Sequence, residues 1–418
     1  MMSSPSQLDG PVLIVCPFID PSAVGEPRWC YDLAKALSDR TETAIISQTP
    51  RNRDFTIADL FPKSKVYEHK SWELDALSPR LHALFKPNYV RFYHEARKVL
   101  AQTDFPKRYL CAHHFGPLGL RFPTPLKGMG LPYVMGPLGG SLPTPAAFVG
   151  ETTRQPWYYR FRDMDGLRFR YDPLLRASYE GADCLVGAAP YVKDLLSALT
   201  LKRFAVRPEI AARAPGPRTA AAIEARQLGD RPVRFLVVSR LIFSKGVQYA
   251  LRAAACLSSK EDWQMDILGD GPMRATLEAL ANDLGIGSKV RFHGHVTRQT
   301  VDDFYGDADV FVFPSIREPS GAVIFEAMSW GLPMIAADYG GPAHHVRAEY
   351  GLLSPVSDPN AYMAGLTSAM ETLLQSPAQR HAMGKAAALA ATKSESLDSM
   401  ADFYINLYRD IARSRTHL

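Results

Sequence analysis

Two basic residues stand close together in the segment Ser239-Arg-Leu-Ile-Phe-Ser-Lys-Gly246. The apolar run before this segment predicts a strand and the residues after it predict a helix, so Arg240 and Lys245 would lie between a strand end and a helix N-terminus. A diphosphate binds well in such a place, because arginine offers a planar fork, lysine a point charge and the helix its unpaired N–H groups. Two solvated surface cations would give the same pattern.

Two carboxylates, Glu318 and Glu326, stand on either side of another predicted transition from loop to helix. Glu318 lies in the loop and Glu326 two turns into the helix, so about 11 Å of helix rise prevents the pair from sharing one proton. The two can hold separate parts of one extended ligand, with the amides of Gly321 and Ala322 facing its phosphates. The alternative is one carboxylate at a helix start and one on the surface, although the apolar neighbours of Glu326 make an unpaired charge costly there.

A third strand-to-helix turn reads Leu268-Gly-Asp-Gly-Pro272. Gly269 and Gly271 let the backbone approach a ligand, and the proline suits the first turn of a helix. As a dinucleotide-binding fingerprint the segment is weak, because Arg274 stands at the third glycine position. A tight turn without a ligand explains the same residues.

Taken in this order, the segments resemble a known family. S-R-L-x-x-x-K-G, L-G-D-G-P, E-x7-E followed by A-M-S-W-G-L-P, and then Gly340-Gly341 are similar to the motifs of the retaining glycosyltransferases of family 4. These are the group 1, glycogen-synthase-like enzymes, which have the GT-B fold of two Rossmann-like domains. The ordered match spans about residues 233–346, and the first half of the chain matches only loosely.

The resemblance implies that Arg240, Lys245 and Glu318 are the catalytic residues. The two cations would hold the donor diphosphate and stabilise the leaving nucleotide, so that neither a metal ion nor a cofactor is expected. Glu318 would contact the donor sugar near its reacting carbon, and Glu326 the ribose hydroxyls. The sugar would keep its anomeric configuration through front-face attack. The other donor-binding residues that the resemblance implies are Gly25, Gly269, Gly271, Gly294, His295, Ser320, Gly321, Ala322 and Val323.

The sequence also departs from the family pattern. Ser320 stands where an aromatic residue is usual, and His344 where a glutamate normally follows the double glycine. Many relatives place a sugar-contacting histidine after the strand at 132–135, where this chain reads Gly136-Pro-Leu-Gly139-Gly140. A subgroup that resembles polysaccharide-assembly enzymes has such a G-P-x-G-G loop, whose backbone amides would replace the histidine. The expected acceptor or sugar contacts are His113, His114, Gly136, Gly139 and Gly140, although paired histidines at a strand end are also common as structural residues.

Short apolar runs alternate with helical patterns through both halves of the 418 residues, which predicts an α/β fold. We expect two doubly wound, Rossmann-like domains that face an interdomain cleft. The Pro-rich stretch 205–230 sets the boundary between an acceptor-binding domain at 1–210 and a donor-binding domain at 211–395, and a helix at 396–418 is expected to pack back towards the first domain. The predicted strands are 11–18, 43–47, 109–112, 132–135, 183–187, 233–239, 264–269, 289–294, 309–315, 333–337 and 351–354.

Composition excludes several classes of protein. Residues 1–210 hold 27 of the 48 basic and 21 of the 43 acidic side chains, an excess too small for a nucleic-acid binder. No apolar run is long enough to cross a bilayer, and the first residues have no signal-peptide pattern. Five scattered cysteines argue against a disulfide framework, so we expect a cytoplasmic protein.

Aromatic and basic residues alternate between Trp157 and Tyr171, a mixture that suits the surface of an anionic membrane. A helix that packs its aromatic rings inward would look the same. The D-x-D at Asp163 and Asp165, which resembles a metal-binding signature of another glycosyltransferase fold, does not follow an apolar strand, so we interpret it as solvated partners of nearby arginines.

The sequence therefore predicts a metal-independent, retaining glycosyltransferase. It would move a sugar from a nucleoside-diphosphate sugar to a glycan, a lipid-linked or another hydroxyl acceptor, in the synthesis of a surface polysaccharide or glycoconjugate. The expected place is the cytoplasm, with peripheral contact to the inner face of the plasma membrane. A phosphorylase or sugar-nucleotide epimerase of the same fold, and a degenerate nucleotide-sugar-binding subunit, are the alternatives.

Overall fold

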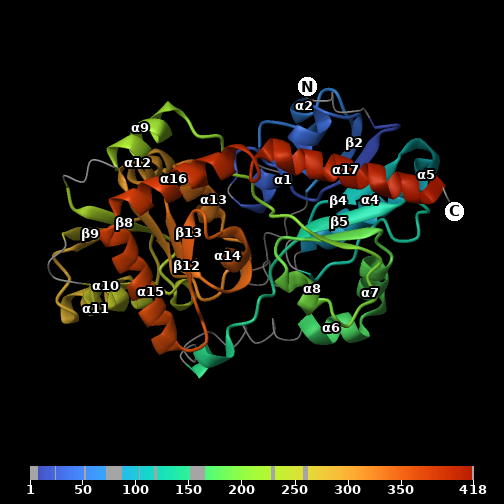
Figure 1. Ribbon diagram of the computed structural model, residues 1–418. Coiled ribbons are helices and arrows are strands. Elements are labelled where there is room, and N and C mark those ends of the chain that lie inside the picture. The colour runs from blue at the N-terminus through green and yellow to red at the C-terminus, as the bar shows by residue number, and fades with distance from the viewer. Residues whose placement is uncertain are drawn as a thin grey trace. The chain divides into compact units, whose positions relative to one another are not determined.

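The computed structural model describes residues 8–23, 25–50, 53–71, 87–102, 104–116, 120–150, 165–226, 231–257 and 262–416. The chain divides into two compact units (Figure 1). Unit 1 consists of residues 1–141, 160–209 and 397–418, and unit 2 of residues 142–159 and 210–396. The described residues 142–150 thus belong with unit 2, although the sequence analysis assigns them to the N-terminal domain.

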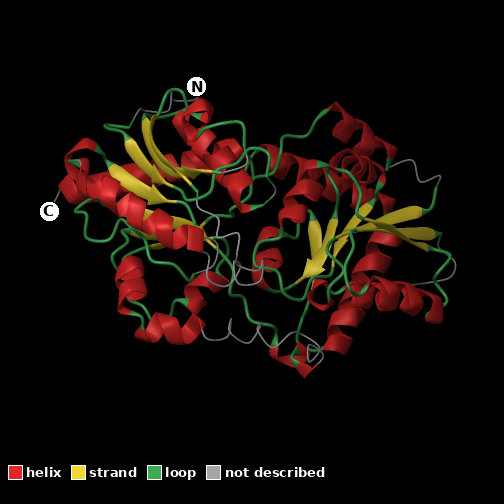
Figure 2. Ribbon diagram, turned by 180° about the vertical axis from the view of Figure 1, so that it is seen from behind, coloured by secondary structure: helices red, strands yellow, loops and turns green. Residues whose placement is uncertain are grey.

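Unit 1 contains a seven-stranded parallel sheet in the order β3-β2-β1-β4-β5-β6-β7. Three of its inner strands are only four residues long and fully buried, as expected where helices cover both faces of a sheet (Figure 2). The strands are β1 (Val12–Val15), β2 (Thr43–Thr49), β3 (Lys65–Lys70), β4 (Cys111–His114), β5 (Tyr133–Leu138), β6 (Cys184–Gly187) and β7 (Phe204–Val206).

Two helices of unit 1 lie beside the predicted histidines of β4. The helix α4 (Pro87–Gln102) covers one face of the sheet, where its aromatic residues join the core, and α17 (Leu397–Thr416) packs against α1 and β4. The other helices are α1 (Glu26–Ser38), α2 (Ile57–Leu60), α5 (Phe105–Arg108), α6 (Asp165–Tyr171), α7 (Pro173–Glu180) and α8 (Tyr191–Leu195).

Unit 2 contains a six-stranded parallel sheet in the order β10-β9-β8-β11-β12-β13. Apolar cores lie on both of its faces, which makes the unit doubly wound. The strands are β8 (Val233–Val238), β9 (Trp263–Leu268), β10 (Val290–Gly294), β11 (Val310–Phe313), β12 (Met334–Ala337) and β13 (Gly351–Ser354). The helices are α9 (Pro217–Ala225), α10 (Val247–Ala255), α11 (Arg274–Asp283), α12 (Arg298–Asp307), α13 (Ala322–Ser329), α14 (Gly340–His345), α15 (Pro359–Gln375) and α16 (Pro377–Thr392).

The predicted α/β class with two Rossmann-like parallel sheets is confirmed. Two strands were missing from the sequence prediction, β3 and β7, which form the edges of the first sheet. Both are only partly buried, and β3 carries charged residues at its ends, so neither shows the continuous apolar run of a central strand.

The segment at 142–150 is tied to unit 2 by an aromatic anchor. Phe148 is fully buried in the core of unit 2, where its ring lies 5.6 Å from that of Tyr249 and 6.0 Å from that of Tyr362. Thr144 accepts a hydrogen bond from Arg317 at 3.2 Å, and the Pro143 carbonyl accepts one from Tyr339 at 3.1 Å. These contacts explain why the segment belongs with unit 2.

We predict that Phe148→Ala lowers the free energy of unfolding of unit 2 by about 3–5 kcal/mol, because it removes a fully buried ring from a packed core. Denaturant unfolding measures this change. Val149→Ala is the matched control, since the neighbouring side chain is 53% exposed and its loss should change stability by less than about 0.5 kcal/mol. Equal losses of unfolding free energy in the two variants would contradict the role of Phe148 as an anchor of this segment.

Candidate functional site

The loop after β8 is held against the loop after β11 by Gly246. This residue has φ 69°, in the left-handed region, and a Cβ atom there would overlap the carbonyl oxygen of Pro314. The backbone N–H of Ile316 donates to the Ser244 carbonyl at 3.0 Å, which joins the two loops further. Only glycine combines this positive φ with the absence of a Cβ atom, so the residue sets how closely the two strand ends approach each other.

This close approach brings together two of the predicted catalytic residues. The Lys245 ammonium forms an ion pair and hydrogen bond with the Glu318 carboxylate, and it also lies 5.6 Å from the centre of the Phe313 ring. The Lys245 and Glu318 side chains are only 17% and 13% exposed. An ion pair this well shielded from water interacts more strongly than a surface pair.

Arg240 differs from Lys245 in its surroundings. Its side chain is exposed at the end of β8, and it has no hydrogen-bond or ion-pair partner in the part of the chain that the structure describes. The guanidinium can therefore bind an anionic ligand without first breaking an internal pair.

The glycines after β9 serve to pack loops together. A Cβ atom at Gly269 would overlap the Ser239 carbonyl oxygen, and one at Gly271 would overlap that of Leu241. The Gly269 N–H donates to the Gly294 carbonyl at 2.8 Å, so the ends of β8, β9 and β10 are joined in turn. The predicted donor-binding residues Gly269, Gly271 and Gly294 thus lie together with the Arg240 loop, and His295 follows them with an exposed side chain.

The loop that carries Glu318 is also fixed by glycines. Gly321 adopts φ 82° and precedes the first turn of α13, where the predicted contacts Ala322 and Val323 lie. The N–H of Gly341 donates to the Glu318 carbonyl at 2.9 Å, and Cβ atoms at Gly340 or Gly341 would overlap backbone of the same loop. Ser320, the residue that departs from the family pattern, is 7% exposed.

Glu326 has partners that the sequence analysis does not identify. Its carboxylate accepts hydrogen bonds from Arg298 at 2.6 Å and from the Tyr305 hydroxyl at 3.1 Å, both on α12. Burial opposes the charge on Arg298, but the attraction of Glu326 outweighs it and raises the pKa of the guanidinium. Burial raises the pKa of Tyr305 well above its usual value, so the phenol stays protonated and donates. The only sequence signal for these partners is the cost of a carboxylate among apolar neighbours.

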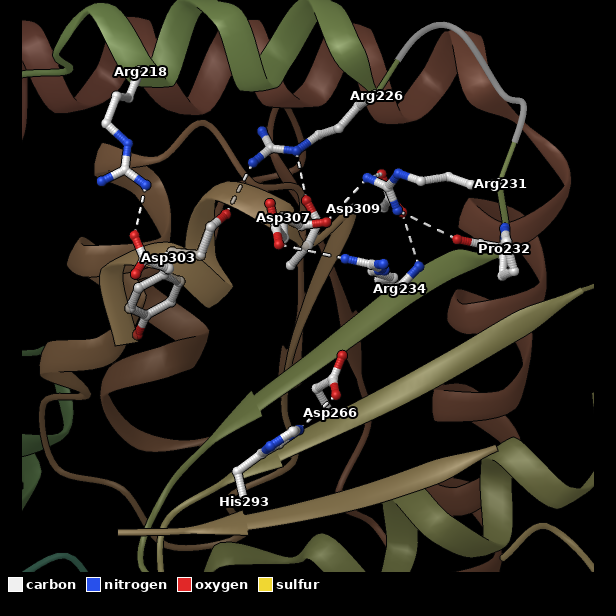
Figure 3. A network of polar contacts seen from close by, with 12 residues as sticks. Arg218, Arg226, Arg231, Pro232, Arg234, Asp266, His293, Asp303, Asp307 and Asp309 are labelled. Carbon is white, nitrogen blue, oxygen red and sulfur yellow. Dashed lines mark hydrogen bonds and ion pairs between the residues drawn. The ribbon is translucent and has the colours of Figure 1, made fainter. Parts of the chain in front are cut away.

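A buried arginine, labelled Arg226 in Figure 3, contacts the ends of both helices that supply this cluster. Arg226 is 3% exposed and donates to the carbonyls of Ala308 at 2.6 Å and Tyr305 at 3.1 Å, at the end of α12. It also donates to those of Trp330 at 3.0 Å and Gly331 at 2.8 Å, at the end of α13. A cation is favourable at helix C-termini, where carbonyls lack internal partners. Burial lowers the pKa of Arg226 to about 10, so it remains charged at neutral pH.

Two further pairs in Figure 3 brace the same sheet. Arg231 binds Asp309 in a bidentate manner, at 2.8 and 3.0 Å, and so ties the start of β8 to the start of β11. His293 contacts Asp266 at 2.7 Å, and its ring lies 4.4 Å from that of Phe304. His293 directly precedes the predicted donor-binding residues Gly294 and His295, and the structure directs its side chain to these internal partners.

In unit 1, the predicted histidines are both buried. His113 has two internal partners, the Tyr408 hydroxyl at 2.5 Å and the Gly136 carbonyl at 2.9 Å, whereas His114 lies with its ring 6.4 Å from that of Tyr89. Burial lowers the pKa of each imidazole to about 3, so both are neutral. The partners of His113 give it a structural role, and its expected contact with an acceptor stays a prediction.

The glycines of unit 1 occupy different environments. Gly25 lies at the exposed start of α1 with φ 83°, and a Cβ atom there would meet nothing within 4 Å. A Cβ atom at Gly136 would instead overlap the Val186 carbonyl oxygen, so this glycine packs β5 against β6. The Gly140 carbonyl accepts from Tyr191 at 3.1 Å, and the neighbouring Gly139 is buried.

Most of the expected membrane-contact segment, with Trp157 and Asp163, lies outside the described residues. At its end, Phe169 is buried in the core of unit 1, whereas Tyr171 is 69% exposed. Among the helices that the structure describes, none combines the length and the apolarity needed to cross a bilayer. The described residues also include no group of three or more histidine, cysteine, aspartate or glutamate side chains arranged to hold a metal ion.

The comparison with protein families agrees with this geometry. Residues 220–389 match the family model of the glycosyl transferases group 1. The match confirms the resemblance to group 1 glycosyltransferases for this part of unit 2, which carries Arg240, Lys245, Glu318 and Glu326.

Relatives and solved structures extend the comparison. The chain is 28% identical over 239 residues to the lipopolysaccharide core biosynthesis glycosyltransferase LpsE of Rhizobium meliloti, a match of 56% of this chain and 66% of that protein. It covers between 31% and 66% of the length of the most similar curated relatives.

The fold is similar to that of a sucrose-phosphate synthase from Thermosynechococcus elongatus, with a TM-score of 0.63 and 20% identity over 97% of this chain and 100% of that one. It is also similar to Anabaena HepE in complex with UDP, with a TM-score of 0.58 and 15% identity over 97% and 100% of the two chains. The GT-B fold class is confirmed by these structures. The matched family and the named relative are glycosyltransferases.

We predict that Arg226→Met lowers the free energy of unfolding by about 3 kcal/mol or more, because it removes the guanidinium from four carbonyls, in hydrogen bonds of which three are buried and one is part-buried. Arg218→Met on the same helix is the control: Arg218 pairs with Asp303 on the surface, where the two side chains are 59% and 51% exposed, and its loss should cost about 0–1 kcal/mol. Urea denaturation compares the two variants. A loss at Arg226 as small as that at Arg218 would refute its role in holding α12 and α13.

Proposed function

We propose that this protein is a retaining glycosyltransferase that uses a nucleoside-diphosphate sugar as donor. The observation that carries the proposal is the placement of Arg240, Lys245 and Glu318 on adjoining loops at the carboxyl ends of β8 and β11. Parallel α/β sheets bind their ligands at this end of the strands. The match of residues 220–389 to the glycosyl transferases group 1 supports the same function.

The donor diphosphate would bind Arg240 and Lys245. Arg240 is exposed and can offer a bidentate fork to phosphate oxygens, whereas Lys245 must exchange Glu318 for the ligand. The exchange is electrostatically favourable, because a diphosphate carries more negative charge than one carboxylate and therefore attracts the Lys245 ammonium more strongly. These cations would stabilise the charge that develops on the leaving nucleotide, and for this reason we propose that the transfer requires no metal ion or other cofactor.

Once Lys245 binds phosphate, the Glu318 carboxylate would be released towards the donor sugar. We propose that it contacts the sugar near the reacting carbon and stabilises the positive charge that forms there as the bond to the diphosphate breaks. A new bond forms between this carbon and the acceptor hydroxyl oxygen, and the hydroxyl proton passes to the leaving phosphate. Retention of configuration follows from the resemblance of the motifs to the retaining family 4 enzymes.

The nucleoside would lie towards α12 and α13. A carboxylate that accepts from Arg298 and Tyr305 still has oxygen lone pairs to accept from two adjacent hydroxyls, so we propose that Glu326 binds the ribose. The exposed His295 and the glycines after β9 and β10 would flank the base. Anabaena HepE, which has a similar fold, was solved with UDP, which supports a nucleotide ligand for this architecture.

We propose that the acceptor is a glycan, a lipid-linked or another hydroxyl compound bound by unit 1, in the synthesis of a surface polysaccharide or glycoconjugate. The similarity to a lipopolysaccharide core glycosyltransferase supports this setting. The cysteines of the chain are all free, as suits the cytoplasm. Exposed Tyr171 and Leu174 beside Arg168 and Arg170 support peripheral contact with an anionic membrane.

Nucleotide binding and turnover test the proposal together. Thermal shifts with UDP, GDP, ADP, CDP and TDP should show one base that stabilises the wild type by mass action. With that nucleotide, Arg240→Ala should weaken binding by about 10- to 100-fold, because a charge-assisted hydrogen bond is lost. Glu318→Gln should keep most of the binding and lower the rate of donor hydrolysis or transfer by about 100-fold or more.

Arg252→Ala is the control for the loss of a cation, because Arg252 is exposed in the last turn of α10, at the opposite end from Lys245. This substitution should change neither nucleotide binding nor the rate of donor hydrolysis or transfer. Full turnover by Glu318→Gln would refute the assignment of this carboxylate. Binding of a nucleotide without turnover of any donor by the wild type would favour a nucleotide-sugar-binding subunit instead.

A further inference from the structure

Residues 142–148 lie against the loop that carries Glu318, and we call this segment the strap. The strap belongs to unit 2. Leu142 is 6% exposed and Phe148 is fully buried, so the strap is packed into the unit at both of its ends. The turn that ends at Phe148 lies beside α15, where its ring contacts that of Tyr362 (Figure 1).

Two hydrogen bonds join the start of the strap to the loops that follow β11 and β12. The Thr144 hydroxyl accepts from Arg317 at 3.2 Å, and Arg317 directly precedes Glu318 in the chain. The Pro143 carbonyl accepts from the Tyr339 hydroxyl at 3.1 Å. The strap therefore binds the residues that come after both of these strands.

The two donors of these hydrogen bonds lie close to each other. Burial raises the pKa of Tyr339, whereas the positive charge of Arg317 lowers it, so the phenol is within electrostatic reach of the guanidinium. Because burial has the larger effect, the phenol keeps its proton at neutral pH and can donate to the strap. One short stretch of the strap thus receives both donors.

A third contact brings the strap close to the backbone of Glu318 itself. Gly340 has φ 65°, and a Cβ atom on this residue would overlap both the Leu142 side chain and the Glu318 carbonyl oxygen. The N–H of the next residue, Gly341, donates to the same carbonyl at 2.9 Å. Leu142 and the Glu318 backbone therefore meet at Gly340, and a shift of the strap would reach that backbone.

The other end of the strap contacts the helix that follows Lys245. The Phe148 ring lies 5.6 Å from that of Tyr249, in the first turn of α10. The Tyr249 ring in turn lies 6.5 Å from that of Phe243, which belongs to the loop of Lys245. The strap thus contacts the surroundings of both partners in the ion pair between Lys245 and Glu318.

The contacts of the strap gain importance when this ion pair is broken. Lys245 holds the Glu318 carboxylate directly. If a diphosphate takes Lys245, as proposed above, the place of the carboxylate depends on the backbone that carries it, and that backbone is held by Gly341 and the strap. A catalytic group that is misplaced by about 1 Å can lose about 100-fold in rate, so the fixation of this loop has a direct consequence for turnover.

We propose that Thr144, Arg317 and Tyr339 are positioning residues that keep Glu318 in place for glycosyl transfer after Lys245 has bound the donor diphosphate. They act through the strap and through the backbone of the Glu318 loop, without contact to the donor. Their role in transfer rests on the function proposed above, whereas the fixation of the loop by the strap does not.

Hydrogen–deuterium exchange without ligand tests the fixation of the loop. The double variant Thr144→Val/Tyr339→Phe removes one acceptor and one donor but keeps the shape of both side chains. Exchange at 316–321 and 339–342 should become about 5- to 30-fold faster, as expected for the loss of two hydrogen bonds. Tyr133→Phe is the matched control, because it removes a tyrosine hydroxyl that donates to the Ser178 carbonyl at 2.8 Å in unit 1. It should leave exchange at 316–321 unchanged.

Steady-state kinetics test the role in transfer. In the double variant kcat should fall by about 10-fold, while the donor KM and the affinity for the nucleoside diphosphate should change by less than about 2-fold. Thr144→Ser keeps the hydroxyl and should keep kcat. In a Glu318→Gln background the double substitution should cause no further loss, because no carboxylate is left to position. Tyr133→Phe should keep the kinetics of the wild type.

The proposal is overturned if exchange at 316–321 does not rise in the double variant, or if it rises equally in Tyr133→Phe. A higher donor KM with an unchanged kcat would also overturn it, since Arg317 would then bind the ligand directly. So would losses of kcat that multiply when the double substitution is combined with Glu318→Gln. Failure of the wild type to turn over any donor would refute glycosyl transfer and the role in it, and the exchange result would still decide whether the strap fixes the loop.

Discussion

The approach of two backbone segments at Gly246 and Pro314 is the constraint on which the candidate site depends. Because Gly246 has no Cβ atom, the loop after β8 can lie directly against the loop after β11. This contact places the Lys245 ammonium beside the Glu318 carboxylate. The same kind of close backbone contact occurs at neighbouring strand ends. There the absence of a Cβ atom lets one loop pack directly against the backbone of another, at Gly269, Gly271 and Gly341. The polar groups of unit 2 are therefore positioned by backbone packing, which is more rigid than side-chain contacts alone.

The charges of the site are arranged in two pairs with one exposed cation. Lys245 neutralises Glu318, Arg298 neutralises Glu326, and Arg240 is exposed at the end of β8. An incoming diphosphate would meet Arg240 without competition and Lys245 only by exchange. The first contact would supply affinity, and the second would couple phosphate binding to the release of Glu318. Arg226 keeps the other pair in place, because it binds the ends of both helices that carry Glu326 and Tyr305.

The site residues that stand at strand ends could be predicted from local patterns of the sequence. The site residues that the sequence did not predict owe their roles to contacts between distant parts of the chain. Arg240, Lys245 and Glu318 follow apolar runs that can only be buried strands, so their positions could be predicted. Arg298, Tyr305 and Arg226 act on Glu326 from distant parts of the chain, and no spacing indicates such contacts. The strand β3 was missed because it is a polar edge strand that lacks the apolar pattern of a buried one. Phe148 has an ordinary apolar context in the sequence, and only its packing shows that the segment around it belongs to unit 2.

Hydrogen–deuterium exchange with and without the nucleoside diphosphate that binds best tests the central claim most directly, because it reports backbone protection along the whole chain. The account predicts added protection in unit 2 at 239–246, 269–274, 294–298 and 318–326, the loops that hold the four charged residues and their neighbours. Protection confined to other segments, or no change at these loops when the nucleotide is saturating, would contradict it.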